Sequence, residues 1–185
     1  MTEEEIIRKL KDMISTKRLK HSLGVRNTAV KLASRYNVST KKARWAGLLH
    51  DCAKGFSKKL LLQKAKEFGI VIDSVCQKIP ALLHGPVGAQ LVKRRFKISD
   101  QDILQAISLH TLGSPQMNDL DKIIFLADYI EPNRDCKAID KLRAKVKGQP
   151  LNEAVRIACD NTIRYNLEQE AIIHPQTIET RNSLL

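Results

Sequence analysis

Six ionisable side chains of this sequence lie on or at the ends of apolar stretches, where burial is expected. Burying an ionised carboxylate without a partner is very costly, so Asp51, which follows two leucines, and Asp128, within "KIIFLAD", each require a positive centre. A lone histidine in such a place is more often a hydrogen-bonded core residue, but four of the five histidines share it. Neutral imidazole and carboxylate are the usual protein ligands of divalent transition metals. The residues that together predict a metal site are His21, His50, Asp51, His84, His110 and Asp128.

The periodicity of the apolar residues places this set on helices. His110 ends one apolar helical face, His21 begins another, and His50 follows Ala43 and Ala46 by seven and four residues. Adjacent helical residues point about 100° apart. The His50–Asp51 doublet therefore serves either one cation at a helix end or two neighbouring cations, and metal sites of this kind are built between facing helices of a bundle.

Capping residues, prolines and glycines mark the expected starts and ends of helices along the chain. The only alternating segment, "GIVID", is too short to anchor a sheet, and Pro175 after His174 predicts an ordered turn. We therefore predict one all-α domain over residues 1–185, a helical bundle with the metal site in its centre. The first expected helix begins at the N-cap Thr2, the second runs from about Leu19 to Tyr36, the third begins at Ser39 or Thr40, and the fourth runs from Ser57 to Gly69. The next two begin at Pro86 and at the N-cap Ser99. The segment "DLDKIIFLADYIE" forms a helix that stops before Pro132, and "PLNEAVRIACDNTIRYNLEQEAII" forms the long last helix.

The composition favours an anionic partner. The formal net charge is +12, which draws nucleic acid, an acidic membrane surface or small polyphosphates. No stretch is apolar enough for a signal peptide or a membrane span, so we expect a cytoplasmic protein without a membrane partner. Its four cysteines form no CxxC pair and are expected as free thiols, and these are Cys52, Cys76, Cys136 and Cys159.

The ordered set of a lone histidine, a His-Asp doublet and a distant aspartate resembles the HD-domain metal-dependent phosphohydrolases. The segments "LLHGPVGA", "ISLHTLG", "KIIFLADYIEPNRD" and "IIHPQTIETRN" extend the similarity over almost the whole chain to the YqeK family. That resemblance implies an iron enzyme that splits diadenosine tetraphosphate symmetrically into two ADP. The chain departs from the family at Leu112, where "HTTG" is expected, and retains Thr111.

The resemblance also implies roles for single residues. It makes His21, His50, Asp51 and Asp128 direct metal ligands, and His84 and His110 members of a second metal site or phosphate contacts. Iron or manganese suits such nitrogen and oxygen donors, and zinc remains open. The implied catalytic set is Asp51, Lys54, His84 and His110. The implied nucleotide contacts are His21, Asp51, Lys54, His84, His110, Thr111, Asp128, Arg134, Ile173, His174, Pro175, Gln176, Thr177 and Ile178, with the last six closing over the nucleotide.

A metal in this site would lower the pKa of its water towards about 7, and the hydroxide would attack phosphorus in line, with ADP leaving. Two alternatives stay open. One is an HD-type nucleotidase acting on nucleoside mono- or triphosphates. The other is a basic RNA-binding protein with an inactive site. The intact ligand set and an aromatic content of only 4% argue against this alternative. A homodimer also stays open.

Overall fold

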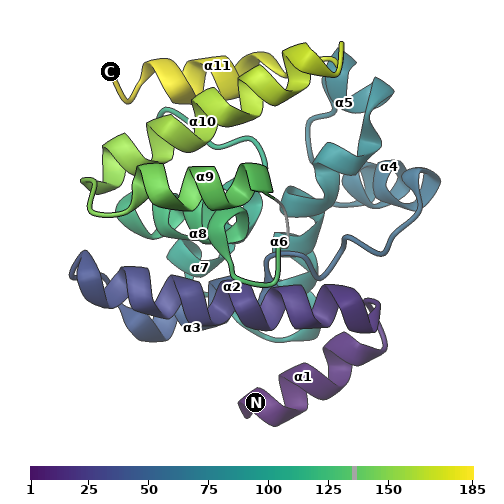
Figure 1. The fold of residues 1–185 in the computed structure, drawn as a ribbon. Helices are drawn as coiled ribbons and strands as arrows, with labels where there is room; N and C mark the ends of the chain where they lie inside the picture. Colours follow the sequence, from purple (N-terminus) through teal and green to yellow (C-terminus); the bar gives the residue numbers. More distant parts are fainter. Residues whose placement is uncertain (135–136) are drawn as a thin grey trace.

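The computed structural model describes residues 1–134 and 137–185, and helices dominate both parts (Figure 1). The α-helices are α1 (Glu3–Lys11), α2 (Thr16–Arg35), α3 (Thr40–Leu49), α4 (Lys58–Glu67), α5 (Ser74–Lys78), α6 (His84–Arg95), α7 (Gln101–Leu109), α8 (Asp119–Ile130), α9 (Lys137–Val146), α10 (Leu151–Glu168) and α11 (Pro175–Asn182). A short 3-10 helix, η1 (Pro80–Leu83), precedes α6. No strand occurs in the described residues, which confirms the predicted all-α class.

The helices are stacked around α2 and α8. In Figure 1, α2 crosses the lower half of the molecule, α8 and α9 lie above it, and α10 and α11 lie above these. Helix α2 packs against α3 and α8, while α7 packs against α3, α6 and α8. The five helices that carry or adjoin the predicted ligands, namely α2, α3, α6, α7 and α8, are therefore neighbours in the middle of the bundle.

An aliphatic core holds these helices together. Leu48, Leu49, Ile107, Ile123 and Ile124 are all fully buried, and few aromatic side chains join them. Burying such a side chain stabilises the fold by roughly 1.5–3 kcal/mol. The polar ligands therefore stand on a rigid apolar frame, which fixes their positions.

Several helix starts confirm the sequence prediction. Thr2 forms the predicted capping box with Glu5, and the side chains of Ser39 and Ser57 accept hydrogen bonds from backbone N–H groups of the first turns of α3 and α4. Helix α2 begins earlier than expected, because the Ser15 hydroxyl accepts from the Arg18 backbone N–H and caps it.

Two other starts were predicted wrongly. Asp100, and not Ser99, caps α7, because its carboxylate accepts from the N–H groups of residues 102 and 103. A negatively charged carboxylate is favoured at a helix N-terminus, because the first backbone N–H groups of the helix have no partner within it. Pro86 is the third residue of α6, which begins at His84 directly after η1, and not its first.

The predicted last helix, from Pro150 to Ile173, ends earlier than expected. Helix α10 ends at Glu168, Glu170 takes a positive φ of 50°, and α11 begins at Pro175 with His174 as its N-cap. Pro175 was predicted to stand in an ordered turn. It instead begins a helix, because proline suits the first helical position, where no N–H is needed.

The helices α5, α9 and α11 and the 3-10 helix η1 were not predicted. Cys52, Cys76 and Cys159 are buried free thiols, as predicted, whereas Cys136 lies outside the described residues. Among the described helices, none has the length and apolarity that crossing a bilayer requires.

Candidate metal centre

The His50–Asp51 doublet stands where a buried helix ends. Helix α3 buries Leu48 and Leu49 and stops there, and residues 50–55 continue as tight turns. His50 is completely buried and Asp51 is 2% exposed. The turn brings Lys54 back towards the doublet, because its backbone N–H donates to the Asp51 carbonyl over 2.9 Å. The doublet therefore projects into the bundle and not into solvent.

Four buried imidazoles are oriented by the same kind of hydrogen bond. In each ring Nδ1 lies against an oxygen acceptor and therefore carries the proton, which leaves the Nε2 lone pair to face the centre. The acceptors are the backbone carbonyls of residues 47, 81 and 107 and one carboxylate. The Nδ1 distances are 2.8 Å for His50, 2.6 Å for His84, 2.7 Å for His110, and 3.0 Å from His21 to Glu131 Oε1. Anchoring of this kind is typical of metal-binding histidines.

Four of the predicted ligands lie close together. His21 Nε2 lies 2.9 Å from Asp128 Oδ1 and 3.7 Å from Asp51 Oδ2. His50 Nε2 lies 3.4 Å from Asp51 Oδ2 and 3.7 Å from Asp128 Oδ1. Ligands bound at about 2.1 Å stand about 3.0–3.4 Å apart around an octahedral or tetrahedral metal. The spacings of 2.9 and 3.4 Å agree with donors of one cation, and the two spacings of 3.7 Å are slightly longer.

The other carboxylate oxygen of Asp51 faces a second group. Asp51 Oδ1 lies 3.1 Å from His84 Nε2 and 3.6 Å from His110 Nε2, and these two nitrogens are 2.9 Å apart. Two lone pairs so close repel each other unless a cation or a proton lies between them. Burial lowers the pKa of His84 to about 4 in spite of the Asp51 carboxylate, which disfavours the proton.

Both aspartates are ionised in this environment. Burial alone would raise their pKa values, but in the metal-free protein the charge of protonated His50 and hydrogen bonds from the neighbouring imidazoles outweigh it and hold the pKa of Asp51 well below its ordinary value. His21, His50 and the Arg134 guanidinium lower the pKa of Asp128 in the same way. The cluster therefore presents negative oxygen donors at neutral pH.

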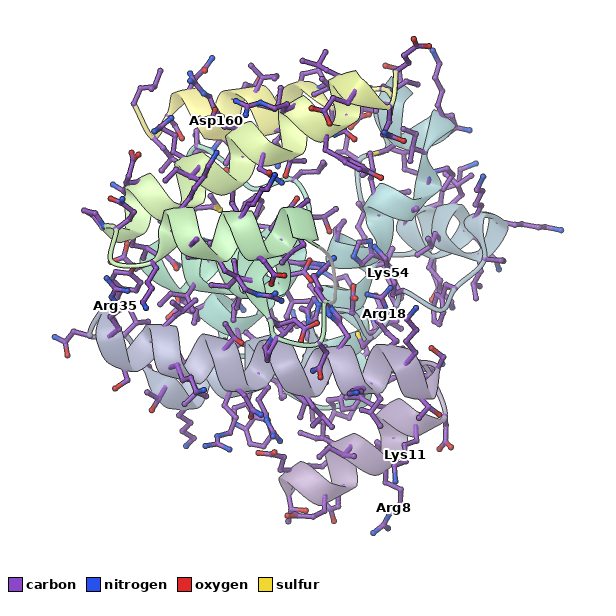
Figure 2. All side chains as sticks on the ribbon, viewed as in Figure 1. Arg8, Lys11, Arg18, Arg35, Lys54 and Asp160 are labelled. Atoms are coloured by element: carbon purple, nitrogen blue, oxygen red, sulfur yellow. The ribbon has the colours of Figure 1, made fainter. Side chains whose placement is uncertain are left out.

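Three cations border the cluster. Arg18 Nη1 donates to Asp51 Oδ2 over 2.7 Å, and Arg134 binds both the carboxylate and the backbone carbonyl of Asp128, over 2.5 and 2.6 Å. Lys54 is exposed, and its Nζ lies 3.3 Å from His84 Nε2. Partial desolvation lowers the pKa of Lys54 in spite of Asp51 and Asp128. Figure 2 labels Arg18 and Lys54 in the same region, above α2.

Thr111 reaches the cluster, because its Oγ1 lies 3.3 Å from His84 Nε2 and 3.2 Å from His110 Nε2. Leu112, which replaces the expected hydroxyl residue, contributes its backbone carbonyl, which accepts a hydrogen bond from Thr180 Oγ1 over 3.1 Å. The Gly113 carbonyl accepts from the Gln176 side chain. The loop after His110 thus joins the cluster to α11.

The structure does not bring the predicted C-terminal contacts to the cluster. His174 Nδ1 accepts from the Gln176 N–H over 3.1 Å, so Nε2 carries the proton and donates to Asp73 Oδ2 over 2.9 Å. Among the described residues, no hydrogen bond or ion pair joins this segment to the six cluster residues. The segment comprises Ile173, His174, Pro175, Gln176, Thr177 and Ile178, of which Thr177 is buried. It is anchored instead to α5 and to the loop after His110.

The sequence analysis missed Glu131 and Arg18. Glu131 is 1% exposed, and its second oxygen accepts from the Asn133 N–H over 2.7 Å while the first holds His21. A signal was present in the helical spacing, since Glu131 follows Asp128 by three residues and Arg18 precedes His21 by three. Each of them therefore shares a helix face with a predicted ligand.

The donor set fits a divalent metal. Nε2 of His21 and Nε2 of His50 are buried and make no hydrogen bond, although carboxylate oxygens are near. A buried polar atom without a partner costs about 1–3 kcal/mol. A cation held by His21, His50 and Asp51 would satisfy both nitrogens, with Asp128 Oδ1 2.9 Å from His21 Nε2, and the Asp51–His84–His110 group offers a second set of donors.

Metal binding is expected to raise the melting temperature. Mn²⁺ at about a hundred times its dissociation constant stabilises the folded state by about 2.7 kcal/mol. For a chain of this size that corresponds to a shift of roughly 5–10 °C in Tm. Differential scanning calorimetry of the metal-stripped protein measures the shift, and Asp51→Asn should show a much smaller one. A Tm that Mn²⁺, Fe²⁺ and Zn²⁺ all leave unchanged would contradict the site.

The helical frame and the buried His-Asp cluster, which could hold a divalent metal, define a helical protein of the HD class. Residues 18–133 match the model of the family described as "HD domain", and the chain belongs to this family. The matched range contains all six residues of the cluster.

The chain is also similar over its full length to named relatives. It is 38% identical to the symmetrical bis(5'-nucleosyl)-tetraphosphatase of Halalkalibacterium halodurans, covering 100% of this chain and 98% of that protein. The protein of the same name from Bacillus subtilis is 38% identical, with 100% and 98% covered. A crystal structure from Clostridium acetobutylicum, described as a predicted HD superfamily hydrolase involved in NAD metabolism, has a TM-score of 0.94 and 42% identity, covering 100% of this chain and 97% of that one.

Proposed function

We propose that this protein hydrolyses diadenosine tetraphosphate symmetrically into two ADP, with a divalent metal in the cluster described above. The observation that carries the proposal is the grouping of His21, His50 and Asp51 at distances that allow one cation, with Asp128 Oδ1 2.9 Å from His21 Nε2. The full-length similarity to symmetrical tetraphosphatases supports the choice of substrate. We further propose that residues 1–185 act as one domain.

Iron or manganese is the proposed metal. The cluster offers imidazole and carboxylate, which suit these ions. The neighbouring thiol of Cys52 is no competitor, because burial raises the pKa of Cys52 to about 12 and keeps it protonated. When bound, such a metal supplies positive charge to phosphate oxygens and lowers the pKa of a water molecule, which provides hydroxide near neutral pH.

The chain's own residues hold the substrate. Lys54 and Arg134 stand at the border of the cluster with exposed or half-exposed side chains, and their charges attract phosphate oxygens. The Thr111 hydroxyl adds a hydrogen bond beside His84 and His110. The segment from Ile173 to Ile178 is proposed to contact the nucleoside, with Gln176 fixed by the Gly113 carbonyl. These contacts orient the central phosphates at the cluster.

The products of hydrolysis test this function. Protein loaded with Fe²⁺ or Mn²⁺ is incubated with dinucleoside polyphosphates of several lengths and with nucleoside mono- and triphosphates, and the products are separated by chromatography. We expect ADP as the sole product from diadenosine tetraphosphate. ATP plus AMP would contradict symmetrical cleavage, and activity confined to mononucleotides would favour an HD-type nucleotidase.

The remaining expectations concern partners and compartment. We propose a cytoplasmic protein, in keeping with the free thiols of Cys52, Cys76 and Cys159. Binding of RNA through its phosphates would weaken steeply with added salt. Salt-sensitive RNA binding that survives loss of hydrolysis would indicate a second activity of the basic surface.

A further inference from the structure

The two oxygens of Asp51 divide the cluster into two sides. Oδ1 faces His84 and His110, and Oδ2 faces His21 and Arg18. If the proposed function holds, cleavage occurs at the central anhydride of a tetraphosphate. Equal halves, each a nucleoside diphosphate, must then extend from the cluster in two directions. Cavities are therefore required on both sides.

On the first side the cavity is mainly apolar. It has a volume of about 240 Å³ and includes Ile70, Leu82, Leu109 and Leu112, with Thr111 and Gln176 among its polar residues. Thr111 also touches His84 and His110, which connects this cavity to the cluster. An apolar pocket with few polar groups suits a nucleobase and ribose.

On the second side the cavity is larger and cationic. It has a volume of about 700 Å³ and lies where the N-terminus of α2 meets the segment after α8. His21 and Glu131 form its inner wall, and the only other ionisable residues lining it, among those described, are basic. These basic residues are Lys17, Arg18, Lys20 and Arg134. The volume lies within the range of about 300–1,000 Å³ found for small-molecule sites.

We propose that this cationic cavity binds the second nucleoside diphosphate half of the substrate. Lys17 and Lys20 are exposed at its rim and contact phosphate oxygens, while Arg18 lies between them and Asp51. The partly exposed Ile139 offers apolar surface to the nucleoside. Asn133 shapes the wall, because its Nδ2 donates to the Lys20 carbonyl over 3.2 Å and ties this segment to α2.

The dissimilarity of the two cavities predicts a division of roles. The apolar cavity recognises a base by shape, whereas the cationic cavity binds through phosphate charge, which every nucleoside diphosphate carries. Selection for a long polyphosphate follows, since a mononucleotide can use only one side. This inference rests on the proposed function but concerns binding, and binding can be measured without turnover.

The experiment compares Lys17→Ala/Lys20→Ala with a matched control, Lys58→Ala/Lys59→Ala. Both double variants remove two exposed positive charges, and the control pair lies at the start of α4, outside the cavity. Isothermal titration calorimetry counts the ADP molecules bound by each Mn²⁺-loaded protein. Steady-state kinetics with diadenosine tetraphosphate give KM and kcat.

We expect two ADP per chain for the wild type and the control, and one for Lys17→Ala/Lys20→Ala over the same concentration range. Its KM should rise about tenfold, equivalent to about 1.4 kcal/mol of lost binding, with kcat nearly unchanged. A wild type that binds one ADP, or a Lys17→Ala/Lys20→Ala variant that still binds two, would overturn the second subsite. A wild type that binds two ADP without hydrolysing the tetraphosphate would instead refute the proposed function.

Discussion

Asp51→Asn is expected to lower the rate of diadenosine tetraphosphate hydrolysis by about a thousandfold or more. Asparagine has nearly the same volume as aspartate but offers one neutral oxygen in place of two that share a negative charge. A bound metal contributes several kcal/mol to the transition state, and each 1.36 kcal/mol is tenfold in rate. Loss of the metal therefore accounts for an effect of this size.

The expectation follows from the central place of Asp51. Its Oδ2 contacts Arg18, His21 and His50, and its Oδ1 contacts His84 and His110, so both proposed donor groups depend on it. An amide would turn its NH₂ either towards the imidazole lone pairs, to which it would donate in place of a metal, or towards the Arg18 guanidinium, where two donors would face each other. Metal content measured by mass spectrometry should fall together with activity.

A matched control separates this effect from simple loss of a buried charge. Asp121 is fully buried in α8 and accepts hydrogen bonds from Gln105 Nε2 over 2.6 Å and from the Asn118 N–H over 2.9 Å, outside the cluster. Asp121→Asn should keep its metal and most of its activity, with only some loss of stability. If Asp51→Asn still hydrolysed the substrate at near wild-type rate, the metal-site assignment would be wrong.

The cluster could be predicted from the sequence because ionisable side chains are rare on the apolar faces of helices. His50, Asp51 and Asp128 are ionisable groups on apolar faces, and a helical period shows which face is buried. The all-α class followed from caps and periodicity in the same way. Both predictions depend on short-range patterns, which a single sequence contains.

The residues that position the cluster needed the tertiary structure. Glu131 looks like an ordinary helix end before Pro132, and only the packing of α8 against α2 brings it to His21. The early end of the last predicted helix was missed because the segment from residue 151 to 173 has no proline or glycine to mark it. A positive φ at Glu170 ends the helix, and local residue preference did not predict it.

Gly24→Ala is expected to weaken metal binding about 10–100-fold, the range for loss of a group that orients a metal ligand. Gly24 lies in the middle of α2, opposite Glu131. A Cβ atom there would stand 2.1 Å from Glu131 Oε2 and 2.6 Å from Asn133 Nδ2. The glutamate would have to move, and His21 would lose the acceptor that fixes its Nδ1 proton and turns Nε2 to the centre.

Two opposing effects determine how Gly24→Ala changes the free energy of unfolding. Alanine is favoured over glycine inside a helix by about 1 kcal/mol, whereas overpacking a filled site costs about 1–3 kcal/mol. The end of a glutamate side chain is normally free to swing away, but here one oxygen holds His21 and the other holds the Asn133 N–H. We therefore expect a net loss of at most about 2 kcal/mol, small enough for the variant to fold.

Two further variants isolate the cause. Gly88→Ala adds the same methyl group within α6, where the nearest atom is Cys52 Sγ at an ordinary 3.4 Å, and should leave metal affinity unchanged. Glu131→Gln keeps the shape but supplies one acceptor oxygen where two hydrogen bonds need two, and should weaken binding as Gly24→Ala does. Competition with a fluorescent chelator measures all three affinities. Wild-type affinity in both Gly24→Ala and Glu131→Gln would show that His21 does not depend on Glu131 for its orientation.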